Sequence, residues 1–111
     1  MYNPPSRAIL KKIPDLGSQK SSYNKDIYMV FRLNEIIWYV AEINHSETEM
    51  GFPPFTQMNV YVRNYDTEDE WRYISLPELE RFEIGNKRVT RDITDANVNK
   101  PRKLKYLIEL G

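Results

Sequence analysis

The chain has 111 residues, enough for one ordinary domain and too few for two. Hydrophobic residues make up 41% and charged residues 29%, so the chain has material for a core and a solvated surface, unlike a disordered polar chain. Its composition, with no cysteine and a single histidine, excludes disulfides, a thiolate nucleophile and a multi-histidine metal site, and its longest apolar run, Ile36 to Ala41, is far shorter than the roughly 18 residues of a membrane span.

Residues 1–25 are predicted to form an irregular basic segment that packs on the rest of the chain. Three prolines and a glycine interrupt any periodic pattern, and only Ala8 to Ile13 looks orderly. The segment has five basic residues against one acid, whereas residues 26–83 have twelve acids against four bases. Because opposite charges attract, we expect the basic ends to fold back over the acidic middle. The amino terminus lacks the apolar core of a signal peptide, so we expect a cytoplasmic protein.

Strand patterns fill the middle of the chain. Residues 27–31 and 36–40 are dense in β-branched and aromatic side chains, and Asn34-Glu35 between them suits a tight hairpin turn. Residues 57–63 alternate apolar and polar side chains, as a half-buried strand does. Residues 70–74 resume an extended pattern that would pair antiparallel with them.

A short helix is predicted after the fourth strand. Ser75 can cap it with its hydroxyl, and Glu78 lies three residues on as the capping-box partner. Residues 87–93 then look like an edge strand protected by its charges. Residues 101–110 fit a helix capped by Asn99, although alternation of their apolar residues fits a strand equally well; we favour the helix.

Together these elements predict an α+β fold. We expect a mainly antiparallel sheet of about five strands, one short helix after the fourth strand, and a possible C-terminal helix. Residues 26–111 are expected to form this single domain. Trp38 and Trp71 should both be largely buried in strands, because their segments have the strongest β pattern.

The residues that common catalytic sites need are missing. The four glycines are too widely separated for a phosphate-binding loop, and His45 beside Ser46 and Glu47 lacks the geometry of a hydrolase triad. Four acids between residues 66 and 70 could collect Mg²⁺ or Ca²⁺, but they lack the glycine and distal glutamate of an EF-hand, so a solvated turn is favoured. We therefore predict a protein that is not an enzyme, with no catalytic residue, metal or cofactor.

Three stretches carry a family pattern. Trp38 to Glu42 reads W-Y-x-x-E, Glu70 to Glu80 contains Y-x-S-L-x-E-L, and Val89 to Ile93 follows. Together they resemble an uncharacterised domain-of-unknown-function family of small proteins encoded on plasmids, phages and integrated elements. Similar segments occur inside large polyvalent proteins associated with antirestriction. The resemblance covers roughly Ile13 to Ile93 and implies a mobile-element setting, without known catalytic residues.

The leading hypothesis is a non-enzymatic protein-binding module of a mobile genetic element. It would dock on a host or element-encoded protein, in its most concrete form as an anti-restriction or anti-CRISPR inhibitor of a nuclease, with no role at a membrane. The 2 Trp, 8 Tyr and 4 Phe supply anchors. If the acidic segments around residues 47–52 and 66–70 share one end of the sheet, they form a rim suited to a basic groove. The predicted partner-binding residues are Glu47, Glu49, Met50, Phe52, Asp66, Glu68, Asp69 and Glu70.

The alternative hypothesis is a nucleic-acid-binding accessory protein that uses the basic C-terminal segment. Basic side chains there could neutralise phosphates, whereas the acidic middle would repel them. The predicted contact residues are Arg88, Arg91, Lys100, Arg102, Lys103 and Lys105. Nucleic acid is a partner only in this alternative.

Overall fold

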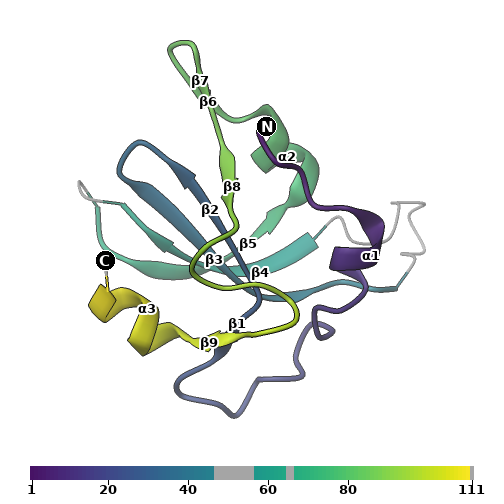
Figure 1. Ribbon diagram of the computed structural model, residues 1–111. Coiled ribbons are helices and arrows are strands. Elements are labelled where there is room, and N and C mark those ends of the chain that lie inside the picture. Colours follow the sequence, from purple (N-terminus) through teal and green to yellow (C-terminus); the bar gives the residue numbers. More distant parts are fainter. Residues whose placement is uncertain (47–56, 65–66, 111) are drawn as a thin grey trace.

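A computed structural model of the protein describes residues 1–46, 57–64 and 67–110 (Figure 1). Its centre is a five-stranded antiparallel sheet in the order β5-β4-β3-β2-β8. The strands are β2 (Met29–Leu33), β3 (Ile36–Ile43), β4 (Gln57–Arg63), β5 (Glu70–Ser75) and β8 (Thr90–Asp92). The predicted α+β fold with a five-stranded antiparallel sheet is confirmed.

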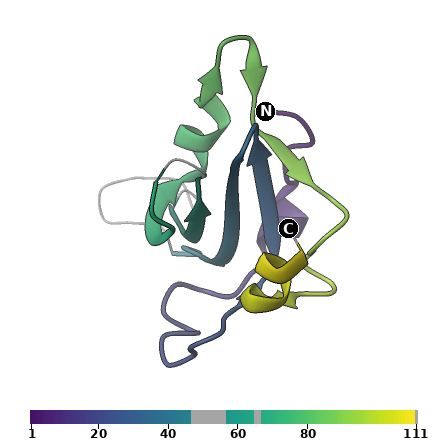
Figure 2. The same ribbon diagram turned by 90° about the vertical axis from the view of Figure 1, so that its left-hand side faces the viewer.

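In the described ranges, three short helices and two small strand pairs surround the sheet. The helices are α1 (Arg7–Leu10), α2 (Leu76–Arg81) and α3 (Leu104–Leu110). The paired strands are β1 (Asp26–Ile27) with β9 (Arg102–Lys103), and β6 (Glu83–Ile84) with β7 (Lys87–Arg88). Figures 1 and 2 show the β6–β7 hairpin projecting at one end of the molecule, with β9 and α3 near the other end. Among the residues that the structure describes, no helix is long and apolar enough to span a bilayer.

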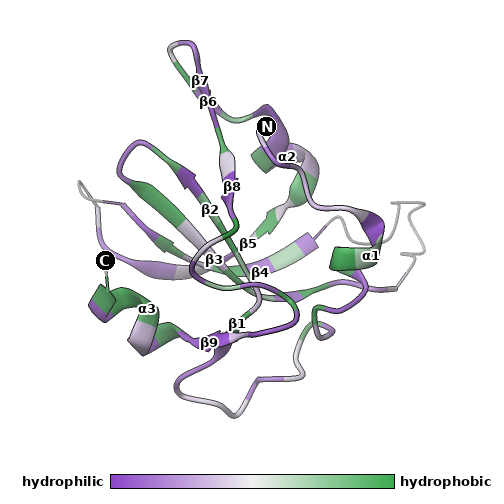
Figure 3. Ribbon diagram, viewed as in Figure 1, coloured by the Kyte–Doolittle hydropathy of each residue, from purple (hydrophilic) through white to green (hydrophobic). Residues whose placement is uncertain are grey.

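The sheet buries a hydrophobic cluster on each face, because successive strand residues point to opposite sides. On one face, which we call the α2 face, the buried cluster comprises Leu10, Ile13, Met29, Phe31, Leu33, Trp38, Val40, Ile43, Met58, Val60, Leu76, Leu79 and Val89. On the other, the α3 face, it comprises Ile27, Val30, Tyr39, Ala41, Ala96, Leu104 and Leu107. Figure 3 shows hydrophobic residues, in green, in the central strands and in α3. Both faces are therefore covered by short elements.

α2 begins where it was predicted, because Ser75 caps its amino terminus. The Ser75 hydroxyl accepts a hydrogen bond from the Glu78 backbone N–H at 3.2 Å and donates to the Glu78 carboxylate at 2.9 Å. Leu76 and Leu79 are buried, and the helix ends at Phe82, whose backbone is extended. The Phe82 ring packs edge-on against Trp38, with 5.7 Å between ring centroids. The capping residue thus fixes where α2 meets the sheet.

The C-terminal helix is confirmed, but its predicted start near Asn99 is wrong. α3 begins at Leu104, after two residues that form β9 against β1. The Asn97 side chain accepts hydrogen bonds from the N–H groups of Asn99 and Lys100, both at 3.0 Å, and closes a turn there. After this turn, Arg102 and Lys103 are extended because they pair with β1, so the helix cannot begin before Leu104.

Two further expectations hold only in part. Trp38 is buried as predicted, whereas Trp71 is only partly buried because it lies on an outermost strand of the sheet. The predicted edge strand over residues 87–93 is divided: residues 90–92 form the edge strand β8, and residues 87–88 belong to the projecting hairpin. The first difference arises from the position of β5 in the sheet, and the second arises because residues 87–88 pair with residues 83–84 rather than with β2.

Candidate functional site

The two outer strands of the sheet, β8 and β5, differ in whether their outer backbone groups are paired. The Tyr2 N–H donates to the Val89 carbonyl at 2.9 Å, and the Arg91 N–H donates to the Tyr2 carbonyl at 3.0 Å, so the amino terminus covers β8. β5 pairs with β4 on its inner side, and no other residue in the described ranges pairs with its outer side. We call this outer side the β5 edge.

The backbone groups that face the β5 edge follow from the hydrogen-bond pattern. The Asn44 N–H donates to the Gln57 carbonyl at 2.8 Å, so Gln57 directs its backbone groups toward β3. Because this direction alternates along a strand, every second residue of β4, beginning with Met58, faces β5. The β5 residues opposite these are Glu70, Arg72 and Ile74, which therefore face β4. Trp71 and Tyr73 consequently direct their N–H and C=O groups to the β5 edge.

A pocket of about 230 Å³ lies beside β5 on the α2 face. Its apolar lining residues are Trp38, Val62, Ile74 and Phe82, and its polar ones are Arg72, Tyr73 and Glu78. Trp38 is 4% exposed and forms a buried wall, whereas Phe82 is 40% exposed and presents apolar surface to solvent. This pocket, which we call the α2 pocket, can accept an apolar side chain.

A second pocket of about 310 Å³ adjoins the α2 pocket and shares Val62 and Arg72 with it. Its remaining lining residues are Asn64, Thr67, Glu68 and Glu70. Glu70 Oε1 lies 3.4 Å from Arg72 Nε, and both side chains are more than half exposed. Because two acids and one base line it, we call it the acidic pocket.

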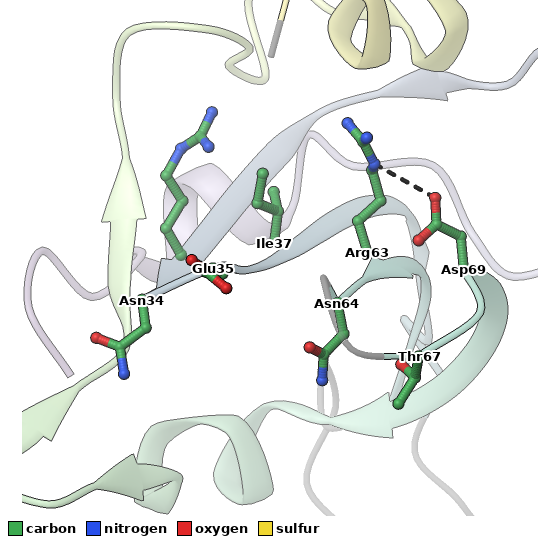
Figure 4. Close-up of a pocket in the computed structure, with 8 residues that line it drawn as sticks. Asn34, Glu35, Ile37, Arg63, Asn64, Thr67 and Asp69 are labelled. Carbon is green, nitrogen blue, oxygen red and sulfur yellow. Dashed lines mark ion pairs between the residues drawn. The ribbon is translucent and has the colours of Figure 1, made fainter.

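A depression of about 500 Å³ lies between the β2–β3 turn and the β4–β5 turn (Figure 4). Figure 4 shows Asn34 and Glu35 on one side of it and Asn64, Thr67 and Asp69 on the other. Arg63 Nε lies 3.3 Å from Asp69 Oδ2. A hydrogen bond with Tyr39 raises the pKa of the Arg63 guanidinium, and the nearby Asp69 charge adds to this effect. Arg63 is therefore held as a cation by neighbouring groups of the same chain.

Arg32, which also lines this depression, is held by two carboxylates. Its Nε lies 2.7 Å from Asp92 Oδ2, and its guanidinium also pairs with Asp95. Burial alone would raise the pKa of Asp92, but hydrogen bonds from Thr94 and Arg32 hold that pKa well below its usual range. Both arginines are thus engaged by the chain's own acids, which argues for a structural role at this end of the sheet.

The predicted partner-binding residues divide between two places. Glu68, Asp69 and Glu70 lie at or beside the β4–β5 turn, where all three line pockets. The remaining members, Glu47, Glu49, Met50, Phe52 and Asp66, lie outside the described residues. The segment that contains most of these joins the end of β3 to the start of β4, whereas the β4–β5 turn follows the end of β4. The described strands thus place the starting points of the two segments at opposite ends of β4. The shared rim depends on residues outside the described ranges and stays a prediction.

The predicted nucleic-acid contacts fall into two separate groups. Arg88 pairs with Glu83 at 3.6 Å in the projecting hairpin, and Arg91 Nε donates to the Asn3 carbonyl at 2.8 Å. The other four, Lys100, Arg102, Lys103 and Lys105, lie on β9, at the start of α3 or just before β9. Figure 1 shows β7 and β9 far apart. These six residues do not form one continuous patch, and binding to nucleic acid stays a prediction.

Comparisons of the chain with protein-family models, with curated proteins and with solved structures found no match. The resemblance to a mobile-element family therefore stays a prediction. Within the described ranges, no group of three or more His, Asp or Glu side chains is placed to hold a metal ion. What the geometry offers for binding is the β5 edge with the α2 pocket and the acidic pocket beside it.

Sequence reasoning found the acidic turn but missed the β5 edge. The outward backbone groups of Trp71 and Tyr73, and the Phe82 wall of the α2 pocket, were not predicted as functional. One signal was available: the strand over residues 70–74 is the last of four consecutive strands, and a helix rather than a strand follows it directly. This pattern does not indicate whether a later strand joins the sheet beside β2 or beside β5.

Proposed function

We propose that this protein is a non-enzymatic protein-binding module that holds an extended segment of a partner protein as an additional strand on β5. The observation that carries this proposal is the set of outward N–H and C=O groups of Trp71 and Tyr73 on an edge with which no other described residue pairs. Strand addition uses such groups for affinity and the neighbouring pockets for specificity.

The treatment of the other edge supports the proposal. At β8 the chain satisfies outward backbone groups with its own Tyr2. Exposed edges are a liability that proteins usually cover or protect with charges. β5 carries the exposed charges of Glu70 and Arg72, which discourage unspecific pairing while leaving the backbone groups accessible. A partner strand of suitable charge is the occupant that this arrangement fits.

The test uses short peptides selected from a random library for binding to the full chain. Tyr73→Pro and Tyr73→Ala both remove the side chain, but only proline removes the outward N–H, and proline is tolerated at such edge positions. We expect the proline variant to bind selected peptides about fivefold more weakly than the alanine variant, the effect of one hydrogen bond. In the unaltered chain, bound peptide should slow hydrogen exchange of the Trp71 and Tyr73 amides. Equal affinities of the two variants, with no such protection, would contradict strand addition.

The mobile-element setting extends this proposal. A counter-defence role, in which the partner is a host nuclease of the restriction or CRISPR type, rests first on the family resemblance. Glu68 and Glu70 beside the β5 edge suit a partner with a basic surface, as a nuclease has along its substrate groove.

A further inference from the structure

We infer that the segment bound at the β5 edge carries an apolar side chain that enters the α2 pocket and a basic side chain that enters the acidic pocket. This inference rests on the proposed strand addition and specifies the chemistry of its occupant. Both side chains lie on the same face of the added strand, so their positions differ by an even number, two or four.

The pairing of β5 with β4 shows on which face of the sheet the partner's side chains would lie. Arg72 lies opposite Val60, and Ile74 lies opposite Met58, and both β4 residues belong to the buried cluster of the α2 face. An added strand continues the same alternation, so every second side chain of the partner lies on the α2 face. Both pockets are on this face and border β5, which places them within reach of those side chains.

The α2 pocket selects an apolar side chain by its lining. Trp38, Val62 and Ile74 form its inner surface, and Phe82 stands over it in edge-on contact with Trp38. An apolar side chain that enters removes the exposed part of Phe82 from water as well as its own surface. Partly enclosed aromatic pockets of this kind are the usual sites of interface anchors.

The acidic pocket selects a basic side chain by its charge. Glu68, Glu70 and Arg72 line this pocket, and Arg72 pairs with Glu70, so two acids and one base leave one negative charge in excess. A Lys or Arg of the partner is attracted here, whereas an acidic side chain is repelled. Because the two pockets share Val62 and Arg72, they are neighbours along the strand. Residues two apart on one face of a strand are about 6.6 Å apart, which matches adjacent pockets better than distant ones.

The experiment selects short peptides from a random library on the full chain and compares their sequences. We expect the bound peptides to share an apolar and a basic residue at positions two or four apart. Phe82→Ala should weaken their binding roughly tenfold by removing the pocket wall. Glu70→Lys should weaken it roughly threefold to tenfold by reversing the charge. The matched controls are Ile93→Ala and Glu109→Lys, which alter an exposed apolar and an exposed acidic side chain elsewhere and should leave binding unchanged.

The outcomes separate this inference from the proposed function. Peptides that protect the Trp71 and Tyr73 amides but share no such pattern, and bind Phe82→Ala and Glu70→Lys normally, would overturn the inference and leave strand addition standing. Selection of no peptide, or of peptides that leave both amides unprotected, would overturn both. The competing occupant of the β5 edge is a second copy of the chain. If the unaltered chain sediments as a dimer and Tyr73→Pro sediments as a monomer, the occupant is that second copy and the inference about a partner segment is wrong. Since Glu70 is exposed, its variant keeps the test decisive if Phe82→Ala fails to fold.

Discussion

At the scale of single residues, Glu42 is a buried acid that links the N-terminal segment to the sheet. Its side chain is only 2% exposed, and its carboxylate accepts hydrogen bonds from the Gln19 N–H at 2.6 Å and the Asn59 side-chain amide at 3.0 Å. A register irregularity at Ala41 places Glu42 opposite Asn59. Burial alone would raise the pKa of Glu42, but these hydrogen bonds outweigh burial and hold that pKa below its ordinary value. Glu42 is thus charged in the folded protein and ties residues 18–19 to the sheet.

The lowered pKa of Glu42 predicts a pH-dependent contribution to stability. A carboxylate whose pKa is lower in the folded state stabilises the fold above its unfolded pKa, about 4.3, and loses that contribution as pH falls through the folded pKa. We expect Glu42→Gln to lower the free energy of unfolding by about 1–3 kcal/mol at pH 7. The difference between the two proteins should shrink as the pH falls from about 5 toward 3, measured by urea unfolding at each pH. A difference that stays constant over this range would show that the charge of Glu42 contributes nothing.

At the scale of elements, features that depend on residues close in sequence were predictable, whereas features that depend on distant residues were not. The turn at Asn34, with φ of 53°, and the Ser75 cap depend on residues close in sequence, and both were predictable. The start of α3 depends on Asn24 and Lys25, about 80 residues away in sequence, so no local pattern could locate it. The same holds for the candidate site. The acidic turn is visible in composition, whereas the β5 edge exists only because of the strand order.

The remote cap of α3 gives a prediction for this element. The Asn24 side chain accepts a hydrogen bond from the Lys105 N–H at 2.9 Å, in the first turn of the helix. Asn24→Ala leaves that donor without its side-chain partner and should destabilise the protein by about 0.5–2 kcal/mol, measured by thermal or urea unfolding. Asn24→Asp is the matched control, since a carboxylate at a helix amino terminus also accepts and is favoured by the dipole. If alanine and aspartate are equally destabilising, this hydrogen bond is not the cause.

At the scale of the whole molecule, the chain ends hold the acidic middle in place. Lys103 pairs with Asp26 at 3.2 Å where β9 meets β1, and Leu10 and Ile13 enter the core of the α2 face. The first residues continue past α1 to the β8 edge, which they cover through Tyr2. One basic end thus closes an edge of the sheet, and the β5 edge stays accessible in the described structure. Under the proposed strand addition, this asymmetry would direct a partner strand to β5.

The cover on β8 predicts what happens when it is loosened. Tyr2→Pro removes the N–H that donates to the Val89 carbonyl at 2.9 Å, whereas Tyr2→Ala keeps it and removes only an exposed side chain. Because Leu10 and Ile13 still anchor the segment, the fold should persist. We expect the Arg91 amide, which donates to the Tyr2 carbonyl, to exchange with solvent about fivefold faster in the proline variant than in the alanine variant, the effect of about one hydrogen bond. The exposed edge should also cause concentration-dependent association, visible by sedimentation velocity. Equal exchange rates and a monomeric proline variant would mean that Tyr2 does not protect β8, and the contrast between the two edges would lose its support.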